Sequence, residues 1–130
     1  MKIHYRWEDE DQTLMLVSLE EGWTWEEYYA VVQQLATTIR RLGHPVDAIV
    51  KNSARIPFPT GSALSHLRQI MRLVPDNIGV IVLVSSNPFV KTINQVLFQL
   101  LPTTREIAEL ADTEDEARTI IAERRARHGR

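Results

Sequence analysis

Hydroxyl side chains and a glycine gather in two short segments of the chain, TGS at residues 60–62 and SSN at residues 85–87. Each segment follows an apolar run and precedes a helical pattern, so each is expected to form a strand-to-helix loop. In open parallel sheets, ligands bind at such loops, beyond the carboxyl ends of the strands. Two neighbouring helix N-termini would favour an anion there, although caps and turns also explain these residue types. The candidate contacts are Thr60, Gly61, Ser62, Ser65, Ser85, Ser86 and Asn87.

The sequence carries no complete motif for catalysis, nucleotide binding or metal binding. Ser62 and His66 are four residues apart and would share a helix face, but no acid is placed to orient His66 and no Gly-x-Ser-x-Gly elbow is present. The glycine-rich nucleotide motifs are missing. The four histidines are scattered and there is no cysteine. We therefore predict no catalytic residue, no metal site and no cofactor.

Length and composition indicate one globular domain over residues 1–130. The chain has 44% hydrophobic and 25% charged residues and a formal net charge of -2. No basic field covers the chain, so a nucleic-acid partner is not expected. No apolar run approaches the roughly 20 residues of a membrane span, and the N-terminal segment lacks the apolar core of a signal peptide. With no cysteine, the composition fits a reducing compartment, and a cytoplasmic location is expected.

The pattern of apolar residues predicts the element order β-β-α-β-α-β-α-β-α. Alternation of strands and helices with short connections implies an α/β fold with a mostly parallel five-stranded sheet and four helices. The first strand is expected to run antiparallel to the second, and the most apolar strand, residues 78–86, to be central. The predicted strands are residues 2–7, 13–19, 46–52, 78–86 and 107–112, and the predicted helices are residues 22–43, 62–74, 87–102 and 113–127.

Helix-start signals support these boundaries. Thr24 with Glu27 and Thr113 with Glu116 have the Thr-x-x-Glu spacing of capping boxes. Asn87 is a predicted N-cap, followed by a proline at the first helical position. The helix that it begins carries a wide apolar face over residues 88–101. That face is core, the wall of a cavity, or a contact between two copies of the chain.

The element order and the segment VDAIVKNSARIPFPTGSALSHL, residues 46–67, resemble the STAS domain, the fold of anti-sigma-factor antagonists. Among STAS-like proteins, the chain is most similar to uncharacterised bacterial STAS/SEC14-like single-domain proteins. In the phosphorylatable members a strand ends in Asp-Ser-Ser/Thr-Gly-Leu-x-x-Leu, and a kinase modifies the second hydroxyl residue. Leu64 and Leu67 match the two leucines, and Ser62 falls at the modified position. Thr60 replaces the aspartate, Gly61 the first serine and Ala63 the glycine of that motif.

Three functions follow as hypotheses. The resemblance implies a non-enzymatic regulatory or protein-interaction module, whose partner is a kinase or an anti-sigma-like regulator and whose candidate phosphorylation site is Ser62. The alternative is a small-molecule or lipid-binding module, as the SEC14 relationship implies. An enzyme with an unfamiliar site at the two loops is the third hypothesis, with Ser62, His66 and Ser86 as its candidate residues.

Overall fold

Five strands form one sheet in the order β1-β2-β3-β4-β5, so each strand lies beside its neighbour in sequence. The computed structural model describes residues 1–130, apart from the side chain of Arg105. β1 is antiparallel to β2 and the other pairs are parallel, which confirms the predicted α/β class and the antiparallel first strand. The central strand is β3, whereas β4, the most apolar one, lies next to the edge. The strands are β1 Ile3–Trp7, β2 Leu14–Leu19, β3 Val46–Asn52, β4 Ile78–Val84 and β5 Ala108–Ala111.

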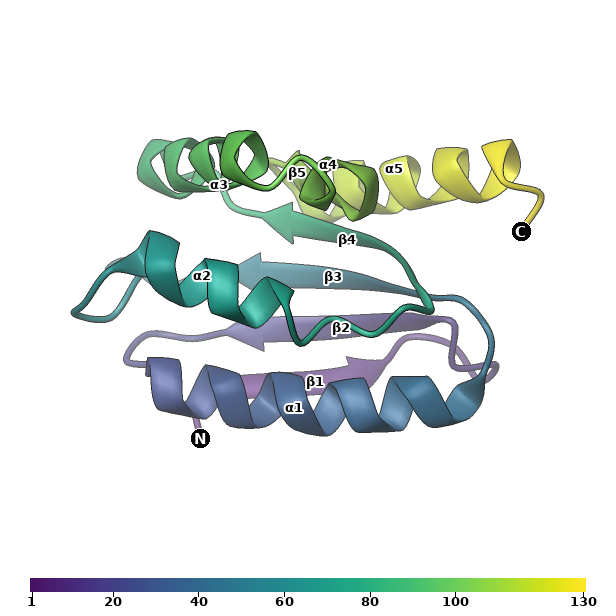
Figure 1. Ribbon diagram of the computed structural model, residues 1–130, viewed down its shortest axis with the longest axis horizontal. Helices are drawn as coiled ribbons and strands as arrows, with labels where there is room; N and C mark the ends of the chain where they lie inside the picture. The colour runs from purple at the N-terminus through teal and green to yellow at the C-terminus, as the bar shows by residue number, and fades with distance from the viewer.

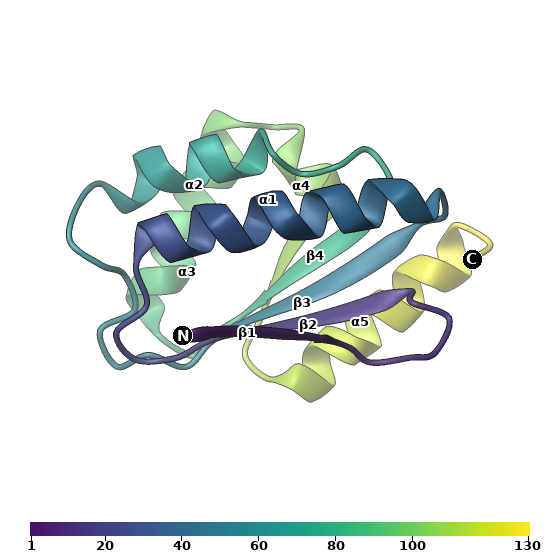
Figure 2. The same ribbon diagram turned by 90° about the horizontal axis from the view of Figure 1, so that it is seen from below.

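The helices are distributed unequally over the two faces of the sheet (Figures 1 and 2). Three helices connect parallel strands that follow one another in a single direction across the sheet. Because such crossovers are right-handed, all three helices fall on the same face, and the C-terminal helix alone covers the other face. The helices are α1 Trp25–Leu42, α2 Ala63–Met71, α3 Pro88–Leu100, the short α4 Thr104–Ile107 and α5 Glu114–Arg127. The four predicted helices are present, and α4 is an additional turn that sequence patterns did not predict.

The alternation of side chains along the strands produces two cores. Val17 of β2 and Ala48 of β3 point toward α1 and α2, whereas Ile49 of β3 and Val82 of β4 point toward α5. Because α5 is the only helix on its side, the β1–β2 part of that face carries polar side chains such as His4, which lies near Ser18 and Glu114. No helix in the described part of the chain is both long and apolar enough to cross a bilayer.

The predicted helix caps form, but the capping boxes are incomplete. The hydroxyl oxygens of Thr24 and Thr113 each accept from the backbone N–H three residues later, at 3.1 Å. The glutamates of the two boxes do not bond back to the cap residues. Glu27 accepts from the backbone N–H of Lys2 at 3.0 Å, and Glu116 accepts from that of Asp112 at 3.2 Å. The Glu27 carboxylate therefore ties the start of β1 to α1, which local spacing does not reveal.

The apolar face of α3 is only partly core. Val90 and Leu97 are buried, but Phe89 and Leu100 are 54% and 51% exposed. A polar residue, Asn94, is buried in the middle of this face. α3 therefore contributes both to the interior and to an exposed apolar surface.

Candidate functional site

The two candidate loops lie at the same edge of the sheet. β3 and β4 are adjacent and parallel, so α2 and α3 both begin beyond their carboxyl ends (Figure 1). The two helices also pack against each other. The structure thus brings together Thr60, Gly61, Ser62 and Ser65 from one loop and helix with Ser85, Ser86 and Asn87 from the other.

Ser62 is the N-cap of α2. Its hydroxyl oxygen accepts from the backbone N–H of Ser65 at 3.3 Å. Thr60, Gly61, Ser62 and Ser65 are all exposed, and Gly61 has a φ of 119°, which an L residue rarely adopts. The Ser62 hydroxyl is therefore a helix cap that remains accessible from solvent.

The second loop is built in the same way. Asn87 caps α3, with its side-chain oxygen accepting from the backbone N–H of Phe89 at 2.8 Å. Ser85 in turn accepts from the backbone N–H of Asn87 at 3.1 Å, while Ser86 is exposed. Ser85 and Asn87 thus shape the start of α3, and Ser86 remains available for contact.

The loop between β3 and α2, residues 53–62, is held by side chains at its start. The Glu21 carboxylate accepts from the backbone N–H groups of Arg55 and Ile56 at 3.0 and 3.2 Å. The Asn52 side chain donates to the Pro57 carbonyl at 2.8 Å and also accepts from a loop N–H. On this fixed loop the Ile56 side chain is 73% exposed. An apolar side chain held out into solvent on an ordered loop is a ready contact for another molecule.

An aromatic cluster, comprising Trp23, Trp25, Tyr28, Phe58, His66 and Phe89, supports this end of the fold. The Phe58 ring joins its two sides, with its centroid 5.9 Å from Trp25 and 5.9 Å from Phe89. Trp23 lies edge-on to Tyr28, with ring centroids 5.4 Å apart, and this pair has the spacing of a hydrophobic staple at the start of α1. The cluster places exposed Phe89 against the 53–62 loop and joins the two candidate segments.

His66 is held within this cluster. Its ring stacks on Trp25, with centroids 4.6 Å apart, and its Nδ1 lies 3.0 Å from the hydroxyl oxygen of Tyr29. A Cβ placed on Gly61 would lie 3.5 Å from Nε2, so that edge of the ring faces the loop. Among the described residues, the side chains of Ser62 and His66 form no hydrogen bond with each other; the only bond between the two residues is the helical one from the His66 backbone N–H to the Ser62 carbonyl, at 3.1 Å. The local geometry therefore gives Ser62 a capping contact and His66 a packing contact.

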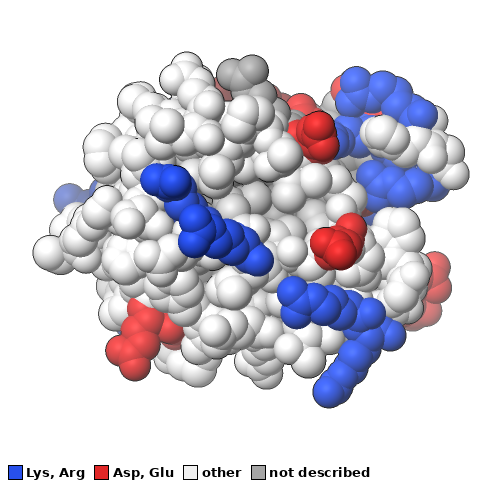
Figure 3. Space-filling view, in the orientation of Figure 1, with Lys and Arg blue, Asp and Glu red and all other residues white. Residues whose placement is uncertain are grey.

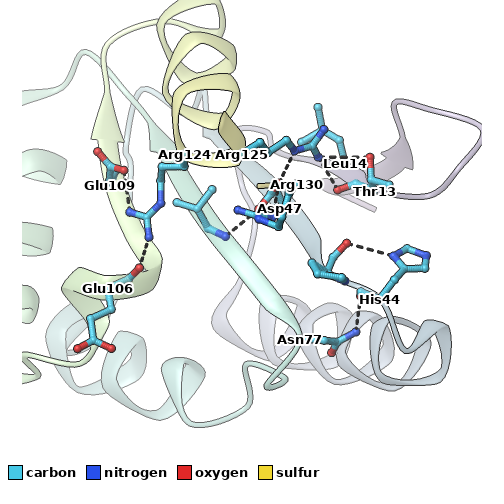
Figure 4. A network of polar contacts seen from close by, with 12 residues as sticks. Thr13, Leu14, His44, Asp47, Asn77, Glu106, Glu109, Arg124, Arg125 and Arg130 are labelled. Atoms are coloured by element: carbon cyan, nitrogen blue, oxygen red, sulfur yellow. Dashed lines mark hydrogen bonds and ion pairs between the residues drawn. The ribbon is translucent and has the colours of Figure 1, made fainter. Parts of the chain in front are cut away.

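A second polar network, which sequence reasoning missed, lies at the opposite end of the parallel strands (Figure 4). Asp47 of β3 is fully buried, and its carboxylate accepts from Arg125 Nε at 2.7 Å and from Arg130 Nη1 at 3.0 Å. Arg125 also donates to the Thr13 carbonyl at 3.0 Å. The network ties α5 and the segment after it to the centre of the sheet. The available sequence signal was an acid inside the apolar run VDAIV.

A bulge in β4 makes room for Asp47. Val46 pairs with Ile78 and Ala48 pairs with Ile81, so Gly79 and Val80 both lie opposite Asp47. The bulge turns the Val80 N–H toward the Asp47 carboxylate, which accepts it at 2.9 Å. A Cβ on Gly79 would overlap both that carboxylate and the Arg130 guanidinium. The Asp47 carboxylate accepts from Arg125, from Arg130 and from the Val80 N–H, so we assign this network to stability.

The face covered by α1, α2 and α3 is locally basic. Figure 3 shows lysine and arginine side chains over α2 and the C-terminal end of α1, with few acids between them. The sequence has only two acids between Glu27 and Glu106: Asp47, which is buried, and Asp76, which is exposed. The exposed arginines of this face are Arg40, Arg41, Arg68 and Arg72. Although the whole chain has a net charge of -2, this face would attract an acidic surface.

Comparison with family models, with curated proteins and with solved structures finds no match to this chain. Among the side chains that the structure describes, no three acids or histidines gather as a metal ion would require.

Proposed function

We propose that the chain is a non-enzymatic interaction module that binds an acidic protein partner through the carboxyl-end surface, defined as Ile56, Thr60, Ser62, Ser65, Ser86 and Phe89. The observation that carries the proposal is the exposure of Ile56 and Phe89, at 73% and 54%, on backbone fixed by hydrogen bonds. Large apolar side chains in a well-ordered surface are typical anchors of an interface. Because the loop is already ordered, binding would cost little conformational entropy.

Charge supports an acidic partner. Arg55 precedes Ile56 in the loop and is exposed, as is Arg68 on α2, and the outer face of α1, α2 and α3 carries few acids. Opposite charge across an interface speeds association and excludes wrong partners. The partner we propose is therefore a protein with an acidic rim around an apolar contact.

Ser62 is the proposed regulatory residue of this surface. Ser62 is exposed and caps the N-terminus of α2. In the sequence it lies between the two apolar anchors, Ile56 and Phe89. A phosphate there would add a charge of about -1.5 to -2. The helix dipole would favour that phosphate within the domain, but the phosphate would repel an acidic partner. Modification of Ser62 would thus release the partner without unfolding the module, in keeping with the STAS-like resemblance of this segment.

The test compares capture of a partner from cell extract by wild-type protein and by surface variants. Ile56→Asp and Phe89→Asp should each reduce the captured amount at least about tenfold, because each places a charge at an apolar contact. Leu100→Asp is the matched control, because it introduces the same charge on the same helix as Phe89→Asp. Leu100 is 51% exposed and Phe89 54%, so the two sites are similar. The Leu100→Asp variant should capture the partner as well as the wild type does. Ser62→Asp should weaken capture, while Ser62→Ala should not.

The proposal fails if a captured protein is retained by both Ile56→Asp and Phe89→Asp, or is lost equally with Leu100→Asp. Circular dichroism of each variant excludes unfolding as the cause of lost capture. Light scattering of the purified chain tests the remaining alternative, a second copy of the same chain as partner. If the wild-type chain is a dimer and Phe89→Asp is a monomer, the surface is a contact between two copies of the chain and not a site for an acidic partner.

A further inference from the structure

An apolar cavity lies in the interior, between the sheet and the helices α1, α2 and α3. Its volume is about 100 Å³, and a second cavity of about 30 Å³ shares several lining residues with it. The walls of the larger cavity include Val31 and Leu35 of α1, Ile70 and Met71 of α2, and Leu97 and Phe98 of α3. Its described lining contains no charged side chain. The carboxyl-end surface does not include this cavity, so the two can be tested separately.

Two polar side chains, Tyr28 and Asn94, line both cavities and therefore stand where the two adjoin. Asn94 is only 4% exposed, and its amide nitrogen donates to the Val90 carbonyl at 2.9 Å. A carbonyl oxygen can only accept, so the atom bonded to Val90 must be Nδ2. The Oδ1 atom is left as an acceptor, and the described residues provide no donor for it.

Tyr28 provides the complementary group. Its side chain is 7% exposed, and the hydroxyl has no hydrogen-bond partner among the described residues. Burial raises the pKa of Tyr28 to about 12, so the hydroxyl keeps its proton at physiological pH and remains a donor. The cavity walls thus hold one donor and one acceptor in otherwise apolar surroundings. Buried polar groups in native proteins nearly always have partners, so a water molecule or the polar group of a ligand is expected to pair with them.

We propose that this cavity binds a small neutral apolar molecule that carries one hydroxyl group. A single hydroxyl can accept a hydrogen bond from Tyr28 and donate one to Asn94 Oδ1. A charged group would be buried without a countercharge, which excludes carboxylates and amines. A dry cavity of about 150 Å³ accommodates benzene, and the two adjoining cavities together approach that size. The ligand class is therefore a phenol or a short alcohol.

Access is available between α1 and α2. Val32 and Met71 line the cavity and are both partly exposed. Methionine has a flexible, unbranched side chain, so rotation of Met71 can widen this side of the cavity at little cost. The ligand would enter through the helical face rather than through the loops at the sheet edge.

The test is titration of the full chain with phenol and with benzene, followed by amide chemical shifts in NMR spectra. Phenol should bind about tenfold more tightly than benzene, because only phenol satisfies both polar groups. Tyr28→Phe should weaken phenol binding by about threefold or more and leave benzene binding unchanged. Tyr29→Phe is the matched control, since it also removes a tyrosine hydroxyl from α1. That hydroxyl bonds to His66, and Tyr29 is not part of the cavity lining.

Ala36→Leu serves as a second variant, because Ala36 lines the cavity and a larger side chain there would fill it. It should abolish binding of both probes. Equal affinity for phenol and benzene in the wild type, or phenol binding that Tyr28→Phe leaves unchanged, would overturn the proposal. A crystal soaked in phenol that shows only a water molecule between Tyr28 and Asn94 would also overturn it.

Discussion

The buried carboxylate of Asp47 allows a quantitative prediction about stability. Asp47→Asn keeps the shape of the side chain but removes the charge that Arg125 and Arg130 bind. Removing one partner of a buried ion pair costs about 3–5 kcal/mol, because the remaining charge has no counterpart. Here the side chains of Arg125 and Arg130 are 29% and 21% exposed, so water can solvate the two guanidinium groups and replace part of their interaction with the Asp47 carboxylate. We therefore expect the free energy of unfolding to fall by about 2–4 kcal/mol.

Urea unfolding followed by circular dichroism measures this loss. Asp76→Asn is the matched control, since it removes an exposed aspartate with the same chemistry and should change stability by less than about 0.5 kcal/mol. Arg125→Ala in both backgrounds completes a double-mutant cycle, and the two residues should couple by about 1–3 kcal/mol. A change of under about 0.5 kcal/mol for Asp47→Asn would refute the reasoning.

Three further changes have expected outcomes. Gly79→Ala should lower the free energy of unfolding by about 1–3 kcal/mol in urea, since its Cβ would overlap the Asp47 carboxylate; an unchanged midpoint would show that the bulge can move. Ser62→Ala should cost about 1 kcal/mol by removing the α2 cap, whereas Ser62→Asp should retain it; equal melting temperatures for the two variants would contradict this. The hydrogen bond from Lys51 holds the pKa of Glu114 below its ordinary value, so their pair stabilises the fold at neutral pH and is lost as acid protonates the carboxylate. Lowering the pH below about 4.3 should therefore reduce the free energy of unfolding more in the wild type than in Glu114→Gln. The difference should be under about 1 kcal/mol, because the side chains of Lys51 and Glu114 are both partly exposed. Identical dependence of stability on pH in the two proteins would show that this ion pair does not stabilise the fold.

Local patterns were sufficient for the strands, the long helices and the caps. The apolar pattern predicted a strand at residues 2–7, where β1 lies, and Thr24, Asn87 and Thr113 each cap a helix as their types indicated. These signals are local because a cap or an alternating strand depends on residues within one turn or a few positions. The short α4 has no side-chain cap hydrogen bond, which explains why cap signals did not predict it.

Contacts between distant segments were not predictable in this way. Asp47 and Arg125 are 78 residues apart, and only the fold brings them together. Likewise, helical spacing places Ser62 and His66 on one face, but it does not show that the Trp25 ring and the Tyr29 hydroxyl hold His66 in the structure. Helical spacing also placed Phe89 and Leu100 on one apolar face, although more than half of each of these residues is exposed in the structure. Periodicity identifies a face, but it does not say how much of that face a neighbour covers.

The order of the strands has a consequence for how fast the chain folds. Every hydrogen-bonded strand pair joins strands that are consecutive in sequence. Each pairing therefore closes only a hairpin or a single helical crossover, and the entropy lost in closing such loops is modest. Folding rates rise as contacting residues become closer in sequence. We therefore expect this chain to fold faster than a parallel sheet of the same size whose neighbouring strands are far apart in sequence.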